Sequence, residues 1–163
     1  MIDPPRYSKV LDQNIQLLGT NSLTYILINK LIYLLIYFSL GGLDTMIITN
    51  RNNVYGHEKW KEKYPKLSRI IHKTDATLDA ADVEIKLEGT GVWYPQDDLK
   101  IIHTPGNTAG ALCVLYETGR ENVLFTGHHL AYLESKKGLE GFKRYNEGNI
   151  EVFIYLLSNV FTH

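Results

Sequence analysis

Residues 47–57 decide the fold: they read Ile-Ile-Thr-Asn-Arg-Asn-Asn-Val-Tyr-Gly-His, a short apolar run followed at once by polar and turn-forming residues. Two later segments have a similar form, 103–108 (His-Thr-Pro-Gly-Asn-Thr) and 124–130 (Leu-Phe-Thr-Gly-His-His-Leu). Taken singly, a Pro-Gly-Asn run is a turn signal, because Pro presets the first turn residue and Gly or Asn tolerates a positive φ. Three such loops, each after a strand-like apolar run, predict a strand-rich α/β domain that presents loops at strand ends.

In this order and wording the three loops resemble those of the metallo-β-lactamase fold, most closely its glyoxalase-II-like branch seen in plants and cyanobacteria. The family motifs read roughly Thr-His-x-His/Asp-x-x-x-Asp-His, Thr-Pro-Gly-His-Thr and Thr-Gly-Asp-His. The resemblance spans about residues 2–18 and 42–149. It implies a partial αββα sandwich with a mixed β-sheet. For the family it also implies zinc- or iron-dependent hydrolysis of a thioester or similar ester by metal-bound hydroxide.

The resemblance also places the metal ligands, and most of these positions hold the wrong type of residue. Two positions hold an imidazole: His57 in the first loop keeps the family's residue type, whereas His128 stands where the family has a metal-bridging aspartate. The positions that hold an amide or no donor at all are Asn50, Asn52, Gly56 and Asn107. Catalytic zinc is held by about three imidazole, carboxylate or thiolate side chains. We therefore expect no catalytic residue, no bound cofactor and only residual metal affinity at His57 and His128.

Periodicity predicts the elements around these loops. Apolar residues recur at helical spacing between Ser8 and Leu18, and the charged segment 57–64 reads as an exposed helix that Pro65 ends. Strands are expected at 45–49, 69–72, 83–87, 99–103, 111–116 and 123–126, the last two joined by a hairpin. The carboxylates between these elements, Asp75 and Asp82 among them, are spaced like loop residues and form no dyad.

Composition restricts the class of protein. The chain has 163 residues, of which 44% are hydrophobic, which suits one domain with a sizeable core. A net charge of −1 gives no electrostatic case for binding nucleic acid, which usually needs a clustered basic surface. The single Cys113 allows no internal disulfide, lies in an apolar strand pattern and fits a reducing cytoplasmic or organellar compartment. The first residues, Met1 to Pro5, lack the basic and apolar regions of a secretory signal.

Residues 23–40 are almost all apolar and have no counterpart in the resemblance, so we interpret 20–41 as an insertion into a domain that spans 1–149. A membrane-spanning helix needs about 20 apolar residues, and Asn29 and Lys30 interrupt this run near its middle. We expect a projecting helix or extended hairpin, with contact to a membrane or a hydrophobic partner as the alternative. Its Ile, Tyr, Leu and Asn bias resembles translated noncoding sequence, as does the divergent apolar tail, 150–163. Relative to the family the sheets would also lack strands, which predicts self-association through unpaired edges.

Three functions remain open from the sequence. The first is a catalytically defective relative of these hydrolases, either a pseudoenzyme or the product of a decayed gene, and the ligand losses favour it. The second is an active metal-dependent hydrolase with a small-molecule thioester or ester substrate. The third is a membrane-associated protein that uses residues 23–40.

Overall fold

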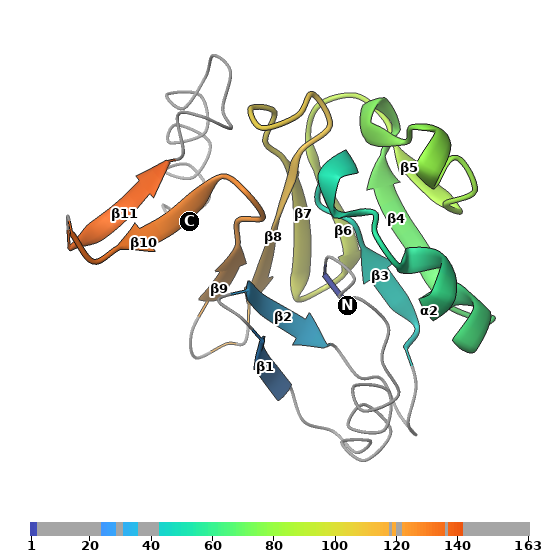
Figure 1. Cartoon of the computed structure of the whole chain (residues 1–163), viewed down its shortest axis with the longest axis horizontal. Helices are drawn as coiled ribbons and strands as arrows, with labels where there is room; N and C mark the ends of the chain where they lie inside the picture. The colour runs from blue at the N-terminus through green and yellow to red at the C-terminus, as the bar shows by residue number, and fades with distance from the viewer. Residues whose placement is uncertain are drawn as a thin grey trace.

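The computed structural model describes residues 1–2, 24–28, 31–35, 43–117, 119, 122–135 and 137–141 as a mixed α/β fold (Figure 1). The strands are β1 (Thr24–Ile28), β2 (Leu31–Leu35), β3 (Thr45–Ile47), β4 (Ser68–His72), β5 (Ile85–Leu87), β6 (Val92–Gln96), β7 (Leu99–His103), β8 (Leu112–Glu117), β9 (Asn122–Phe125), β10 (Leu130–Leu133) and β11 (Gly138–Gly141). The helical segments are η1 (Arg51–Asn53), α2 (His57–Lys63), η2 (Lys73–Asp75) and η3 (Leu78–Ala80).

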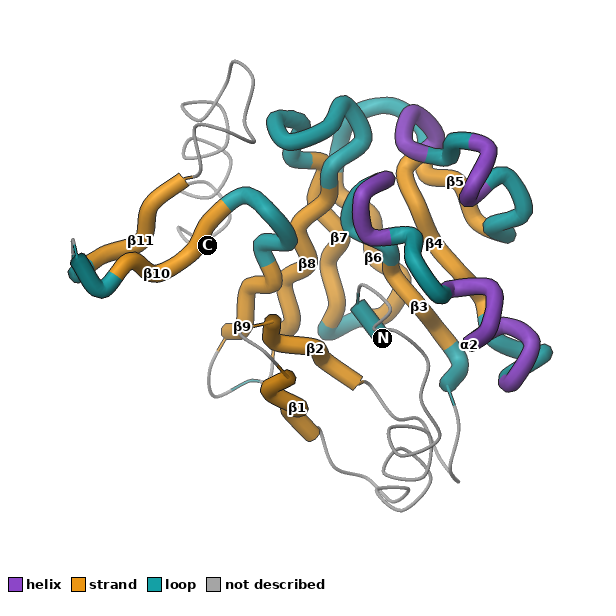
Figure 2. The backbone as a smooth tube through the Cα atoms, viewed as in Figure 1, coloured by secondary structure: helices purple, strands orange, loops and turns teal. Residues whose placement is uncertain are grey.

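The first half of the fold is a parallel sheet in the order β3-β4-β5. Ile2 extends it through an isolated parallel bridge to Ile47. Parallel strands need a crossover between them, and α2 supplies the one between β3 and β4. Figure 2 shows the helical segments gathered around this sheet.

The second half is an antiparallel sheet in the order β6-β7-β8-β9, in which each strand pairs with the next along the chain. The pairing of Glu117 with Asn122 confirms the expected hairpin between β8 and β9. A further antiparallel pair, β10 and β11, follows.

Two hydrophobic clusters define the layers. Alternation along β3 and β4 sends Ile47 and Ile70 to the face that packs against the second sheet, where Ile101, Val114 and their neighbours receive them. The opposite face of β3 and β4 packs instead under the fully buried Trp60 of α2 and the residues around it. The described core is therefore helix on parallel sheet on antiparallel sheet.

Most of the expected elements are present, with their ends shifted by one or two residues. The segment 83–87 differs from the expected strand in length and burial. Val83 is buried, but the strand itself covers only Ile85–Leu87, and Ile85 is 41% exposed at the edge of its sheet. Strands β6, β10 and β11 were not expected from the sequence pattern. The expected helix from Ser8 to Leu18 and the tail 150–163 lie outside the described residues.

The apolar run at 23–40 contains an antiparallel hairpin, in which β1 pairs with β2 from Thr24↔Leu35 to Ile28↔Leu31. This is the extended form of the two that we expected, and within the described residues neither strand joins another sheet. In the described part of the chain, we find no helix with the length and apolar character to span a bilayer.

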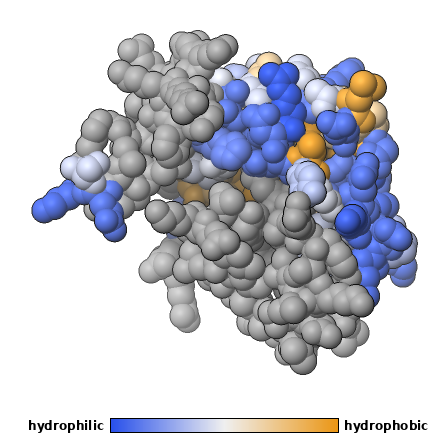
Figure 3. Space-filling model, in the orientation of Figure 1, coloured by the Kyte–Doolittle hydropathy of each residue, from blue (hydrophilic) through white to orange (hydrophobic). Residues whose placement is uncertain are grey.

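On the face that Figure 3 shows, the described residues are mostly hydrophilic, with small apolar areas. Among the residues whose burial the structure describes, the exposed large hydrophobic side chains are Tyr55, Leu78, Ile85, Val92 and Tyr94. The edge strand β6 contains Pro95, which has no N–H for a second neighbour, and the edge strand β5 carries Lys86; both residues discourage pairing with another chain.

Candidate functional site

The three loops that the sequence singled out meet at one end of the two sheets. We call residues 49–57, 104–110 and 126–129 loops 1, 2 and 3, and together the loop cluster. Loop 1 is tied to the second sheet where Leu112 donates its backbone N–H to Thr49 O over 2.8 Å. Loop 3 touches loop 1 because Gly127, at φ 54°, lies so close to Thr49 that a Cβ there would be 2.8 Å from its Oγ1.

Loops 2 and 3 meet through Asn107 and His128. Asn107 Nδ2 donates to His128 Nδ1 in a long contact of 3.5 Å. Behind them, His129 is buried with its Nε2 3.1 Å from Thr104 Oγ1. Burial lowers the pKa of His128 below its ordinary value of 6.5, which favours the neutral ring that can accept from the amide.

Asp75, at the end of η2, joins loops 1 and 2. Its side chain is fully buried and accepts from Arg51 N and Gly110 N at 3.0 Å each, and also from Thr108 Oγ1. Gly110 is required here, since a Cβ would lie under 3 Å from Thr74 and Asp75. The sequence pattern predicted an ordinary loop residue at Asp75 and missed this role, because nothing in the local pattern shows that the carboxylate is buried.

The amide positions of loop 1 are used within the loop itself. Asn50 is buried, its Oδ1 accepts from Asn52 N at 3.0 Å to cap η1, and its Nδ2 donates to Thr49 Oγ1. Asn52 is exposed. Gly56 adopts φ 87° and starts α2, a conformation that suits glycine.

His57 takes part in a different set of contacts. It is 1% exposed, its Nδ1 lies 2.7 Å from Arg69 Nη1, and its Nε2 lies 2.8 Å from Asp79 O. A guanidinium can only donate, so Nδ1 is the acceptor and Nε2 carries the proton that is donated to the Asp79 carbonyl. Both ring nitrogens of His57 are thereby used, and the ring is neutral.

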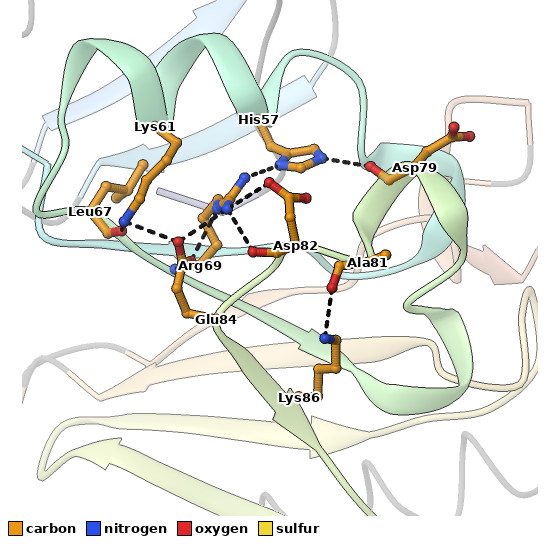
Figure 4. Close-up of polar contacts among 9 residues, drawn as sticks. All are labelled: His57, Lys61, Leu67, Arg69, Asp79, Ala81, Asp82, Glu84 and Lys86. Carbon is orange, nitrogen blue, oxygen red and sulfur yellow. Dashed lines mark hydrogen bonds and ion pairs between the residues drawn. The ribbon is translucent and has the colours of Figure 1, made fainter.

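Arg69, from β4, is the centre of this network (Figure 4). Its side chain is 3% exposed and forms ion pairs with Asp82 and Glu84 at 2.9 and 3.0 Å. Lys61 adds a second cation, 3.0 Å from Glu84. Burial by itself would raise the pKa of Glu84, but the hydrogen bonds from Arg69 and Lys61 outweigh it and lower the pKa to about 2. We call these residues, with His57, the Arg69 network.

A charged residue inside the apolar strand pattern Arg-Ile-Ile-His was the signal that could have revealed this network. A buried arginine needs carboxylate partners. Asp82 and Glu84 lie just before the strand that pairs beside β4. The expectations from sequence did not connect these residues.

Two further histidines stack next to the loop cluster. The rings of His72 and His103 lie 4.3 Å apart and nearly parallel, at 6°. His103 Nε2 donates toward Ala109 O in loop 2, and His72 Nε2 toward Gly89 O. Burial lowers the pKa of His103, the Ala109 carbonyl opposes this, and the neighbouring His72 lowers it further. His72 is the last residue of β4, and it is buried and caps η2.

The donors of the loop cluster do not fit the metal that the family resemblance implies. His57 is engaged by Arg69, Asn50 by its own loop, and Asn107 by His128. Zinc favours imidazole, carboxylate or thiolate donors, and a neutral amide is a poor replacement. Within the described residues, His57, Glu58 and Asp82 are the one group of three or more His, Cys, Asp or Glu side chains whose ligand-type atoms all lie within 4.8 Å of one another. Two of these three already contact the guanidinium of Arg69.

No protein-family model matches the chain, and no curated protein matches it by sequence. A solved structure that resembles it is that of a probable metal-dependent hydrolase from Staphylococcus aureus, with a TM-score of 0.41 and 10% sequence identity. The match covers 52% of this chain and 38% of that protein, so the chain spans well under half of its neighbour's length. The site is therefore interpreted from its own residues.

Proposed function

We propose that this chain is a non-catalytic relative of the metallo-β-lactamase-fold hydrolases, in which the loop cluster has become a structural junction. Within this proposal the helix, parallel sheet and antiparallel sheet form three layers of an αββα sandwich of the glyoxalase-II-like branch. The observation that carries the proposal is the state of His57, whose two ring nitrogens are both hydrogen-bonded to protein groups.

The donor chemistry supports the same proposal. A hydrolytic zinc ion needs about three protein ligands and an open position, and it must lower the pKa of its bound water to about 7. His128, the other imidazole at the ligand positions implied by the resemblance, lies 3.5 Å from Asn107 Nδ2, and amides occupy most of the remaining positions. The buried Asp75 does not compensate, because its two oxygens accept hydrogen bonds from loops 1 and 2.

The test is metal content and turnover of the purified full chain. We expect substoichiometric zinc and iron by elemental analysis after growth with either metal, and no turnover of thioester or β-lactam probes above the buffer rate. One metal per chain with turnover would overturn the proposal. The double variant Asn50→His and Asn107→His should bind more metal than the parent. A matched control, Asn122→His, adds an imidazole at an exposed end of β9 and should not.

An active hydrolase is the second candidate, because the three loops do meet at one end of the sheets through Thr49, Gly127, Asn107 and His128. Turnover that is lost in His128→Ala but kept in Asn122→Ala would favour this candidate.

A further inference from the structure

The Arg69 guanidinium lies among the same side chains that would otherwise be a candidate metal site. His57, Glu58 and Asp82 offer ligand atoms within 4.8 Å of one another. Arg69 Nη1 is 2.7 Å from His57 Nδ1, and Arg69 Nη2 is 2.9 Å from Asp82 Oδ2. Two of the three side chains that could bind a metal ion therefore already bind a protein cation.

Every nitrogen of this guanidinium donates a hydrogen bond. Nε donates to Glu84 Oε2 over 3.0 Å, and Nη2 donates also to Glu84 Oε1 and to the backbone oxygen of Asp82. The Arg69 backbone N–H donates to Glu84 as well, over 2.9 Å. The arginine side chain is 3% exposed, and the carboxylates of Asp82 and Glu84 compensate its buried charge.

We propose that Arg69 is the built-in cation of this cluster: it excludes divalent metal ions from His57 and Asp82, and its removal turns the cluster into a site for zinc or a similar ion. The inference rests on the proposed metal-free state of His57 and on none of the amide positions of the loop cluster.

Charge compensation supports the replacement of the Arg69 guanidinium by a divalent metal ion. With Arg69 present, two cations, Arg69 and Lys61, face the carboxylates of Asp82 and Glu84 around a neutral imidazole. Without Arg69 the carboxylates exceed the cations, and the nearby Glu58 adds another negative charge. A divalent ion would restore the balance with an imidazole and oxygen donors, which suit zinc.

The distances in the cluster indicate how the side chains would have to move to bind a metal ion in place of the guanidinium. Zinc binds imidazole nitrogen and carboxylate oxygen at about 2.0–2.2 Å. The present contacts of 2.7 and 2.9 Å are made to two different nitrogens of the guanidinium, so His57 and Asp82 would have to move toward a single ion between them. Glu58 and Asp82 are exposed, which leaves their side chains free to adjust.

The experiment compares the parent chain with Arg69→Ala, each stripped of metal and titrated with zinc and with cobalt. We expect the thermal midpoint of Arg69→Ala to rise with zinc concentration, and its cobalt form to show the visible absorption of a bound ion. The response should be lost in the double variants Arg69→Ala/His57→Gln and Arg69→Ala/Asp82→Asn. As the matched control, Lys73→Ala removes an exposed cation from its pair with Glu88 and should give no zinc response.

A second measurement uses the parent chain and does not depend on the folding of a variant. The nitrogen resonances of His57 should report a neutral ring protonated at Nε2, unchanged by zinc. A shift of the His57 resonances on zinc addition would overturn the inference, as would a folded Arg69→Ala chain without a zinc response. If the proposed function fails because the loop cluster binds metal, that binding would be lost in His128→Ala and kept in Asp82→Asn, so the two failures are distinguishable.

Discussion

Removing the charge of Asp75 should loosen the loop cluster while the rest of the fold persists. In Asp75→Asn, the side-chain orientation that loses the fewest hydrogen bonds puts the amide nitrogen in place of Oδ1, where it faces the N–H of Gly110. One hydrogen bond to a charged acceptor is then lost, and the bonds from Arg51 and Thr108 to the other oxygen become neutral ones. A bond to a charged group contributes about 1.5–3 kcal/mol. We therefore expect the free energy of unfolding to fall by about 2–3 kcal/mol.

The assay is urea denaturation followed by tryptophan fluorescence, together with amide hydrogen exchange. A loss of this size should lower the thermal midpoint by about 4–12 °C for a chain of this length, and the amide of Gly110 should exchange faster than in the parent. The control is Asp79→Asn, an exposed position whose side-chain change should stay within about 0.5 kcal/mol. Equal effects of the two substitutions would refute the assignment of Asp75 as the group that joins loops 1 and 2.

Three further predictions concern pH and backbone. Because the guanidinium and ammonium beside it lower the pKa of Glu84 from 4.5 to about 2 against the effect of burial, its stabilisation is present above pH 4.5 and lost as the pH falls toward 2; Glu84→Gln should flatten acid unfolding curves in that window. Because burial lowers the pKa of His103 below 6.5, stability should decrease as the pH falls below 6.5, and His103→Gln should reduce that decrease; an unchanged slope would contradict it. In chemical denaturation, Gly127→Ala should lower the free energy of unfolding by about 1–3 kcal/mol more than Gly89→Ala does. Both glycines have positive φ, but only at Gly127 would the new Cβ meet Thr49. Equal losses of stability would show that the close approach to Thr49 is unimportant.

Much of the framework follows from the sequence. Alternating apolar residues and turn signals placed the strands around β3, β4, β7, β8 and β9, because burial of one or both faces imposes a pattern that is visible along the chain. The same signals did not predict β6, because Pro95 and the exposed Tyr94 interrupt the alternation of apolar and polar residues in this edge strand. The apolar run at 23–40 fitted a helix or a hairpin equally well, since a short apolar segment has no period that separates the two.

The candidate site divides in the same way. From the sequence came the three loops, the amides at Asn50 and Asn107, and the imidazoles at His57 and His128, because these are properties of residue type and order. Which groups those side chains contact depends on distant segments: Asp75 reaches Gly110 across 35 positions, and the partners of His57 are 12 and 22 positions away. Only tertiary structure decides that His57 hydrogen-bonds with Arg69 and Asp79, because hydrogen bonding and charge compensation act between groups brought close in space, whatever their separation along the chain.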